Sequence, residues 1–144
     1  MNSGASECRD GLSAGHGGEP VSVWVQRWTS LVPVGGTVLD VACGLGRHTR
    51  WFLARGHRVF AVDRSGEAIA GVQALAPSGT DERLETRVAD LEAGPWLFAG
   101  QRFDAVVVTN YLWRPLLPVI VDGVAPGGVL IYETFAAGNE AFGK

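Results

Sequence analysis

The fold is decided by the stretch Thr37-Val38-Leu39-Asp40-Val41-Ala42-Cys43-Gly44-Leu45-Gly46-Arg47-His48. A short apolar run ends in a carboxylate, a glycine-containing turn of small residues follows at once, and the segment from Arg47 to Arg55 has helical character. This order predicts a strand, a tight loop and a helix. Such junctions hold nucleotide-type ligands, because glycine lets a ligand approach the backbone closely and the free N–H groups at a helix start attract negative charge.

A second apolar strand follows and also ends in an acid. It is expected over 58–62, within the stretch from His57 to Asp63. Asp63 lies 19 positions after Gly44, which is about the spacing at which an acid at the end of the second strand of a Rossmann-type fold meets ribose hydroxyls. We therefore expect Asp63 to lie beside the ligand.

Strand and helix patterns alternate along the rest of the chain. The expected strands span about 37–42, 58–62, 84–89, 103–109 and 129–135. The expected helices span about 46–55, 66–76 and 112–123, with Gly56 ending the first and Ser65 capping the second. Strands separated by helices form a parallel sheet with right-handed crossovers. The predicted fold class is α/β, a Rossmann-like parallel sheet with strand order 3-2-1-4-5 and flanking helices.

An amphipathic segment that opens at Pro20 precedes the first strand. Its apolar residues recur at helical spacing, and they are Val21, Trp24, Val25, Trp28, Leu31 and Val32. This pattern predicts a helix that packs against the sheet. Residues 1–19 are rich in Gly, Ser and charge and are expected to be a disordered tail, which leaves 20–144 as the domain.

Composition narrows the class of protein. The chain has 144 residues, 47% of them hydrophobic and 19% charged, which suits one soluble globular domain. A formal net charge of -3 gives no electrostatic reason to expect a nucleic-acid partner. The sequence shows no signal peptide and no apolar stretch that would span a membrane. Cys8 lies in the predicted tail and Cys43 in the loop, so we expect no structural disulfide and a cytoplasmic location.

The stretch from Asp40 to Gly46 resembles the first motif of class I S-adenosylmethionine-dependent methyltransferases, (D/E)-x-G-x-G-x-G, with Ala42 in place of the first glycine. The resemblance extends from about Val21 to Lys144. Within the family, the sequence from Val38 to His48 is similar to the small, single-domain branch that includes tellurite-resistance-type methyltransferases. The resemblance implies S-adenosylmethionine as the cofactor, and no metal site is expected.

The resemblance also implies roles for individual residues. Asp40 would lie under the methionine end of the cofactor, Asp63 would bind both ribose hydroxyls, and Asp90 would lie near the adenine amino group. Thr109 would face the methionine end. The remaining implied cofactor contacts are Ala42, Cys43, Gly44, Gly46, Arg64, Leu91 and Asn110. The candidates for the acceptor side are Asn110, Tyr111, Trp113 and Arg114.

The chain departs from the family pattern at its end. Family domains continue after the fifth strand with two more strands, whereas this sequence stops at Lys144, nine residues after Phe135. The usual C-terminal part is therefore expected to be missing. The fifth strand would then be an exposed edge, which makes a homodimer through that edge a hypothesis.

Methyl transfer from a sulfonium is an in-line displacement in which the protein mainly aligns donor and acceptor. No catalytic dyad is needed unless the acceptor must lose a proton, and the sequence contains no hydrolase or phosphate-loop motif. His48 and His57 lack partners at metal-ligand spacing. Arg47 and His48 are expected to cap the helix or to be solvated. The expected acceptor is a small molecule.

Two alternatives stay open. The first is a truncated methyltransferase-like domain that binds the cofactor or a partner without catalysis, because function depends on the site and not on the fold. The second is an NAD(P)-dependent oxidoreductase. Its G-x-G-x-x-G fingerprint would need a third glycine where Thr49 stands, and Asp40 would repel a pyrophosphate.

Overall fold

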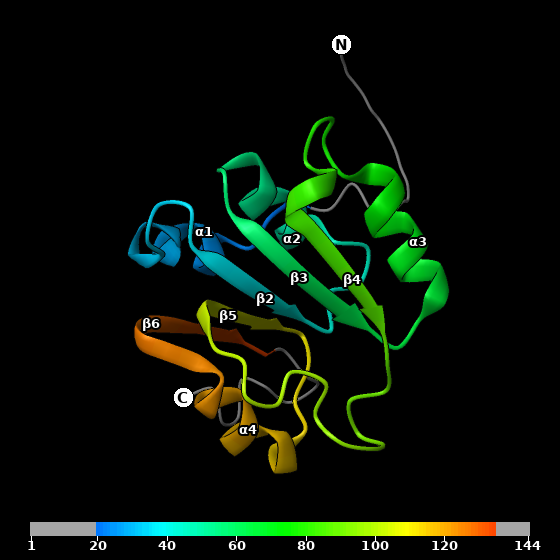
Figure 1. Ribbon diagram of the computed structural model, residues 1–144, viewed down its shortest axis with the longest axis vertical. Helices are drawn as coiled ribbons and strands as arrows, with labels where there is room; N and C mark the ends of the chain where they lie inside the picture. The colour runs from blue at the N-terminus through cyan, green and yellow to red at the C-terminus, as the bar shows by residue number, and fades with distance from the viewer. Residues whose placement is uncertain (1–19, 135–144) are drawn as a thin grey trace.

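The structure of the protein is a computed structural model that describes residues 20–134. A five-stranded parallel sheet forms its centre (Figure 1). The strands are β2 (Thr37–Val41), β3 (Arg58–Asp63), β4 (Leu84–Val88), β5 (Phe103–Thr109) and β6 (Val124–Glu133). Their spatial order is β4-β3-β2-β5-β6, and every neighbouring pair is parallel. The predicted order 3-2-1-4-5 is therefore confirmed.

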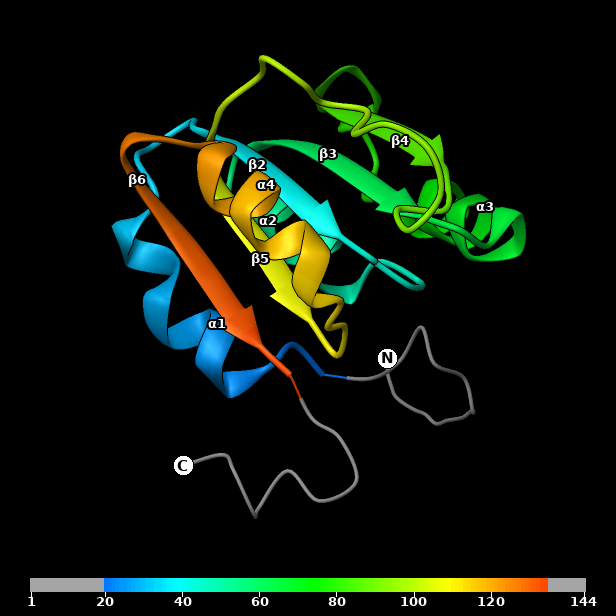
Figure 2. The ribbon, with the colours of Figure 1, turned by 90° about the horizontal axis from the view of Figure 1, so that it is seen from below.

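Helices cover both faces of this sheet. They are α1 (Val23–Trp28), α2 (Arg47–Ala54), α3 (Gly66–Leu75) and α4 (Leu117–Asp122), with short 3-10 turns at Thr29–Leu31, Asp81–Arg83 and Arg114–Leu116. Figures 1 and 2 show α2 on one side of the sheet and α4 on the other. Buried contacts place α1 and α2 on one face, together with α3, and α4 with the loop before β5 on the opposite face.

Alternating side chains along the central strands build these two cores. In β2, Val38 packs with α1 and α2, whereas the next residue, Leu39, packs on the α4 side. The same alternation separates Val107 from Val106 in β5. All four side chains are fully buried. This explains the nearly continuous apolar runs of both strands, since a central parallel strand has no solvent-facing side.

Local signals at the helix ends act as predicted. Ser65 caps α3, because its side chain accepts a hydrogen bond from the Ala68 N–H at 3.0 Å. Gly56 follows α2 with a φ of +92° and donates its N–H to the Leu53 carbonyl oxygen. These two caps fix where α2 ends and where α3 begins.

The N-terminal helix differs from the prediction. The helix begins at Val23, three residues after Pro20, and Ser22 is its N-cap. At Thr29 it continues as a 3-10 turn. Val25 is buried, but Trp24 and Leu31 are 41% and 54% exposed. The regular spacing overstates the buried face because the helix changes its pitch before Leu31.

The last helix and the last strand also differ from the expected ranges. The helix is confined to α4, preceded by the 3-10 turn at Arg114–Leu116, because Pro115 and Pro118 each lack an N–H donor. β6 begins at Val124 and not near 129, and its pairing with β5 is irregular between Phe103 and Ala105. Gly128 lies in this irregular part, where a Cβ atom would come within 2.7 Å of the Asp104 carbonyl oxygen.

Among residues 20–134, β6 is an outer strand of the sheet, as expected. The described part of the chain has no helix long and apolar enough to cross a membrane. The expected tail at 1–19 and the chain end after 134 lie outside the described residues.

Candidate functional site

The carboxyl ends of β2 and β5 lie side by side, and the chain leaves them in opposite directions. From β2 it crosses through α2 to β3, and from β5 it crosses through α4 to β6 on the other side. In open α/β sheets, ligands bind outside the strand ends at such a reversal. The first residue after each strand, Ala42 and Asn110, has a positive φ, +55° and +57°. They are the two non-glycine residues with positive φ in the described part of the chain, and such geometry often clusters at ligand sites.

Two adjoining cavities open at this edge and share Ala42 and Asn110. The larger of the two, the nucleoside-sized cavity, has a volume of about 440 Å³. It is lined by Ala42, Asp63, Arg64, Ala89, Asp90, Leu91, Glu92, Asn110, Tyr111 and Leu112. The smaller cavity has a volume of about 200 Å³. It is lined by Ala42, Cys43, Gly44, Leu45, Arg47, His48, Thr109 and Asn110. A ligand that fills both would run over the reversal point.

Asp63 joins the loop after β2 to the turn after β3. Its Oδ2 accepts a hydrogen bond from the Gly44 N–H at 2.9 Å, and its Oδ1 accepts one from the Ser65 N–H at 2.9 Å. A carboxylate has about four acceptor positions, so each oxygen retains capacity for a ligand hydroxyl. The side chain therefore holds the loop in shape and can still face the nucleoside-sized cavity.

Asp40 lies beneath the same loop and is only 1% exposed. Its Oδ2 accepts a hydrogen bond from the Thr49 hydroxyl at 2.7 Å, whereas its Oδ1 has no hydrogen-bond partner. Burial raises the pKa of the Asp40 carboxyl to about 7, although the bond from Thr49 and the Arg47 charge lower it. A buried oxygen without a partner is costly, so a hydrogen-bond donor from a ligand or a water molecule would stabilise it.

The two loop glycines serve different purposes. A Cβ atom at Gly44, whose φ is +59°, would meet nothing within 4 Å, so the backbone here is open toward the smaller cavity. A Cβ atom at Gly46, whose φ is +86°, would lie 2.9 Å from the Val72 side chain. Gly44 thus leaves room for a ligand, while Gly46 lets α3 pack against the start of α2.

The far wall of the nucleoside-sized cavity is built from two loops. Asp90 accepts the Glu92 N–H at 2.9 Å, and this turn presents Glu92 to the Tyr111 hydroxyl, which donates to it at 3.0 Å. The Tyr132 hydroxyl donates to the Tyr111 carbonyl oxygen at 2.9 Å. Burial, followed by the bond to Glu92, raises the pKa of Tyr111 to about 12, so this residue stays a neutral donor.

His48 is buried, with 2% exposure, and is neither a helix cap nor solvated, which corrects the prediction. Its Nε2 accepts the Ser22 N–H at 3.1 Å, and its Nδ1 lies 3.4 Å from the Thr109 hydroxyl oxygen. Burial, and then the Arg47 charge, lowers the pKa of His48 to about 4. The sequence offered no signal for this role, because Ser22 is 26 positions away.

Cys43 is a free, buried thiol in the loop. Burial, with added repulsion from Asp40 and Asp63, raises its thiol pKa far above the ordinary value, so thiolate chemistry is disfavoured. No group of three His, Cys, Asp or Glu side chains in the described part of the chain could hold a metal ion.

The cavities bring together most of the residues that the sequence singled out. Those that line a cavity are Ala42, Cys43, Gly44, Asp63, Arg64, Asp90, Leu91, Thr109, Asn110 and Tyr111. Asp40, Gly46, Trp113 and Arg114 line neither of them. Sequence reasoning missed Glu92 and Leu112 on one wall and misjudged His48 on the other.

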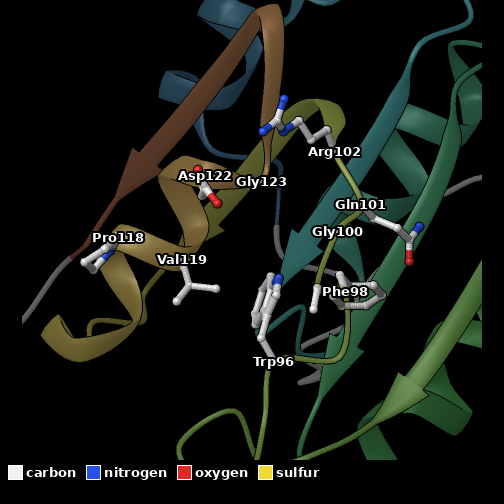
Figure 3. A pocket seen from close by; sticks show the side chains of 10 residues that line it. Trp96, Phe98, Gly100, Gln101, Arg102, Pro118, Val119, Asp122 and Gly123 are labelled. Atoms are coloured by element: carbon white, nitrogen blue, oxygen red, sulfur yellow. The ribbon is translucent and has the colours of Figure 1, made fainter.

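A hollow larger than either of these cavities lies elsewhere, near the amino end of β5. It measures about 680 Å³ and lies between the loop before β5 and α4. Figure 3 shows Trp96 and Val119 at one end of it and Arg102 and Asp122 at the other. No strained residue borders this hollow, and it is on the wrong edge of the sheet for the strand-end rule. We therefore assign the ligand site to the carboxyl edge.

This fold and this site define a class of nucleotide-type ligand-binding domain, and comparison with known proteins identifies its family. A family model described as a methyltransferase domain matches residues 38–128, which is more than half of the chain. The chain therefore belongs to the methyltransferase domain family. The resemblance to class I S-adenosylmethionine-dependent methyltransferases is confirmed.

Two curated relatives illustrate the range of the family. The trans-aconitate 2-methyltransferase of Streptomyces avermitilis is 33% identical over 128 residues, covering 83% of this chain and 46% of that protein. The tRNA U34 carboxymethyltransferase of Pseudoalteromonas translucida is 30% identical over 139 residues, covering 88% of this chain and 42% of that protein. The chain thus spans less than half the length of these relatives.

Solved structures agree on the fold. The glycopeptide N-methyltransferase MtfA is 29% identical with a TM-score of 0.59, over 74% of this chain and 50% of its own. Its complex with S-adenosylmethionine aligns with a TM-score of 0.59 at 27% identity, over 83% and 59% of the two chains. A TehB-like methyltransferase from Corynebacterium glutamicum has a TM-score of 0.62 at 20% identity, over 78% and 63%. That last likeness concerns the fold alone, so the tellurite-resistance branch stays a prediction.

Proposed function

We propose that the protein binds S-adenosylmethionine across the two cavities and transfers its methyl group to a small-molecule acceptor. One observation carries the proposal: the cavities meet at Ala42 and Asn110, at the reversal point of the sheet. The nucleoside would lie in the larger cavity and the amino-acid part in the smaller one. Residues 20–144 would form the methyltransferase domain.

The residues at the site fit the cofactor chemically. Asp63 offers carboxylate acceptors for ribose hydroxyls, and Asp90 and Leu91 line the place proposed for adenine. Gly44 leaves open space for the ligand next to the backbone. The unpartnered Asp40 oxygen suits a cationic amino group held in place through the loop or a water molecule.

When bound, the cofactor supplies a methyl group on an already activated sulfonium. The protein then needs to align donor and acceptor and to exclude water, since orientation alone accounts for much of such a rate enhancement. Among the acceptor-side candidates, Asn110 and Tyr111 are the two that line the proposed cofactor site. Trp113 and Arg114 follow them in the chain and would reach an acceptor only outside the two cavities.

The relatives and solved neighbours of this chain are named after different kinds of molecule. The molecules in these names are trans-aconitate, tRNA and a glycopeptide. A small acceptor is favoured by the formal net charge of -3 and by the acidic residues around the nucleoside-sized cavity, which repel a polyanion. We expect a cytoplasmic location because Cys43 is a free thiol.

Calorimetric titration with S-adenosylhomocysteine tests the cofactor assignment, with NAD as the parallel ligand. We expect micromolar binding of the former only. Asp63→Asn keeps the size of the side chain but removes its charge, and we expect affinity to fall roughly tenfold or more, the loss typical of a charged hydrogen-bond partner. Asp122→Asn makes the same change beside the distant hollow, and we expect it to bind like the wild type.

Three outcomes separate the alternatives. Preferential binding of NAD would support the oxidoreductase and contradict the proposal. Binding of S-adenosylhomocysteine without turnover on any of a panel of thiols, amines and carboxylates would favour a non-catalytic binding domain. Equal loss of affinity in Asp63→Asn and Asp122→Asn would show that the carboxyl edge is not the binding site.

A further inference from the structure

His48 is a buried polar residue for which methyl transfer itself has no use. It lines the smaller cavity from α2 and contacts two segments that are far apart in sequence. One is Ser22, which precedes α1, and the other is Thr109, at the end of β5. The side chain thus connects the N-terminal segment with the floor of the site.

The hydrogen bonds of His48 define its tautomer. The backbone N–H of Ser22 can only donate, so the Nε2 atom that it contacts must be unprotonated. A neutral imidazole then carries its proton on Nδ1, which faces the Thr109 hydroxyl oxygen. That hydroxyl therefore accepts from His48 and has its own proton available in another direction. Thr109 lines the smaller cavity, so this proton is available to a ligand acceptor there.

The N-terminal segment is held in place by several further contacts at the same edge. The Ser22 hydroxyl donates to Glu133 at the end of β6 and also accepts the N–H groups of Trp24 and Val25. The Arg47 guanidinium donates to the Pro20 carbonyl oxygen at 2.6 Å. Figure 2 shows this segment passing the carboxyl end of β6 before it enters α1. Both Arg47 and His48 therefore touch the segment and line the smaller cavity.

We propose that His48 is a positioning residue that couples the docked segment 20–22 to ligand binding in the smaller cavity. Docking of Ser22 selects the Nδ1–H tautomer, and this tautomer orients the Thr109 hydroxyl toward the ligand. Undocking frees Nε2, and the imidazole then reverts to the Nε2–H form, which donates nothing to Thr109. The inference rests on the proposed function, because the ligand concerned is the amino-acid part of the cofactor.

The test separates the tautomer from ligand affinity. Two-bond 1H–15N correlation spectra of the full chain identify which imidazole nitrogen of His48 is protonated, without any ligand. Ser22→Ala removes the hydroxyl and keeps the N–H, whereas Ser22→Pro removes both. Ser22 has a φ of -55°, which proline can adopt. The difference between these variants isolates the N–H bond to His48.

We expect the Nδ1–H tautomer in the wild type and in Ser22→Ala, and its loss in Ser22→Pro. Affinity for S-adenosylhomocysteine should fall roughly tenfold more in Ser22→Pro than in Ser22→Ala, the scale of one hydrogen bond. His48→Leu should resemble the proline variant. His48→Gln keeps an acceptor for Ser22 and should retain most of the affinity. His57→Gln is the matched control, since buried His57 contacts the Gly36 carbonyl oxygen outside the site.

Either of two results overturns the coupling alone: an Nε2–H tautomer in the wild type, or equal affinities in Ser22→Ala and Ser22→Pro. Wild-type protein that binds no S-adenosylhomocysteine overturns the proposed function and, with it, the coupling. The tautomer spectrum distinguishes these failures, because it does not depend on the ligand.

Discussion

Two buried titratable side chains beneath the cavities have pKa values displaced in opposite senses by the same cause. Burial disfavours the charged form, which is the deprotonated form of Asp40 and the protonated form of His48. The pKa of Asp40 is raised from 3.8 to about 7, and that of His48 is lowered from 6.5 to about 4. Both side chains are therefore largely uncharged in mildly acidic solution.

These displacements predict a specific pH dependence of stability. Asp40 contributes stability that is present below pH 3.8 and is lost as pH rises through 7, because the folded state holds its proton more tightly. His48 contributes stability that is present above pH 6.5 and is lost as pH falls through 4, because the unfolded state takes up a proton first. The two contributions oppose each other between about pH 4 and 6.5.

Single variants expose each contribution. His48→Gln removes the His48 contribution, which decreases as pH falls. The free energy of unfolding of this variant relative to wild type should therefore rise as pH falls from 7 to 4. Asp40→Asn removes the Asp40 contribution, which increases as pH falls. The free energy of unfolding of this variant relative to wild type should therefore fall over the same range. Urea denaturation at several pH values measures both slopes. Parallel curves for the two variants would contradict the assignment.

At the scale of elements, the junction between β2 and α2 shows how one loop serves packing and binding together. Gly46 starts α2 in contact with Val72 of α3, and Gly44 faces open space at the smaller cavity. The motif spacing that identified the loop does not distinguish these two glycines. Their separate purposes follow from where α3 lies.

Alanine substitutions should separate packing from binding. Gly46→Ala adds a clash with Val72 to the cost of a positive φ and should lower the free energy of unfolding by about 2–4 kcal/mol. Gly44→Ala incurs only the backbone cost, about 1–2 kcal/mol. Gly44→Ala should nevertheless weaken S-adenosylhomocysteine binding more, since its methyl group points into ligand space. Chemical denaturation and calorimetry measure the two effects, and a reversed order of stabilities would refute this division.

At the scale of the whole molecule, the edge formed by β6 and α1 in the described part of the chain is a candidate surface for self-association. Within residues 20–134 β6 is an outer strand, and α1 packs against it. Val23, Trp24 and Leu31 are 79%, 41% and 54% exposed on α1 and the turn after it. Exposed strand edges beside apolar side chains favour pairing with a second copy.

We therefore predict a concentration-dependent homodimer, measured by sedimentation velocity over a hundredfold range of protein concentration. The double variant Trp24→Ser/Leu31→Ser should weaken association about tenfold or more, since it removes much of the apolar area. Leu75→Ser is the control, because Leu75 is 49% exposed on α3, which packs beside β4 at the opposite edge of the sheet. A monomer at every concentration would exclude the dimer.

The sequence by itself determined the sheet and the location of the site. The apolar runs of β2 and β5, the caps at Ser65 and Gly56, and the loop between Asp40 and Gly46 are local signals. They act through neighbouring backbone atoms, so they can be interpreted without knowing the rest of the fold. The strand order then follows from right-handed crossovers and from the family resemblance.

Tertiary structure alone decided which side chains meet. The contact of His48 with Ser22 spans 26 positions, and that of Ser22 with Glu133 spans 111. The early start of β6 and the exposure of Trp24 likewise depend on how neighbouring elements pack. Periodicity fixes which residues share a face, but it does not fix the angles and offsets between elements. Those offsets place a polar atom within hydrogen-bonding distance of its partner, and hydrogen bonds weaken steeply with small changes in geometry.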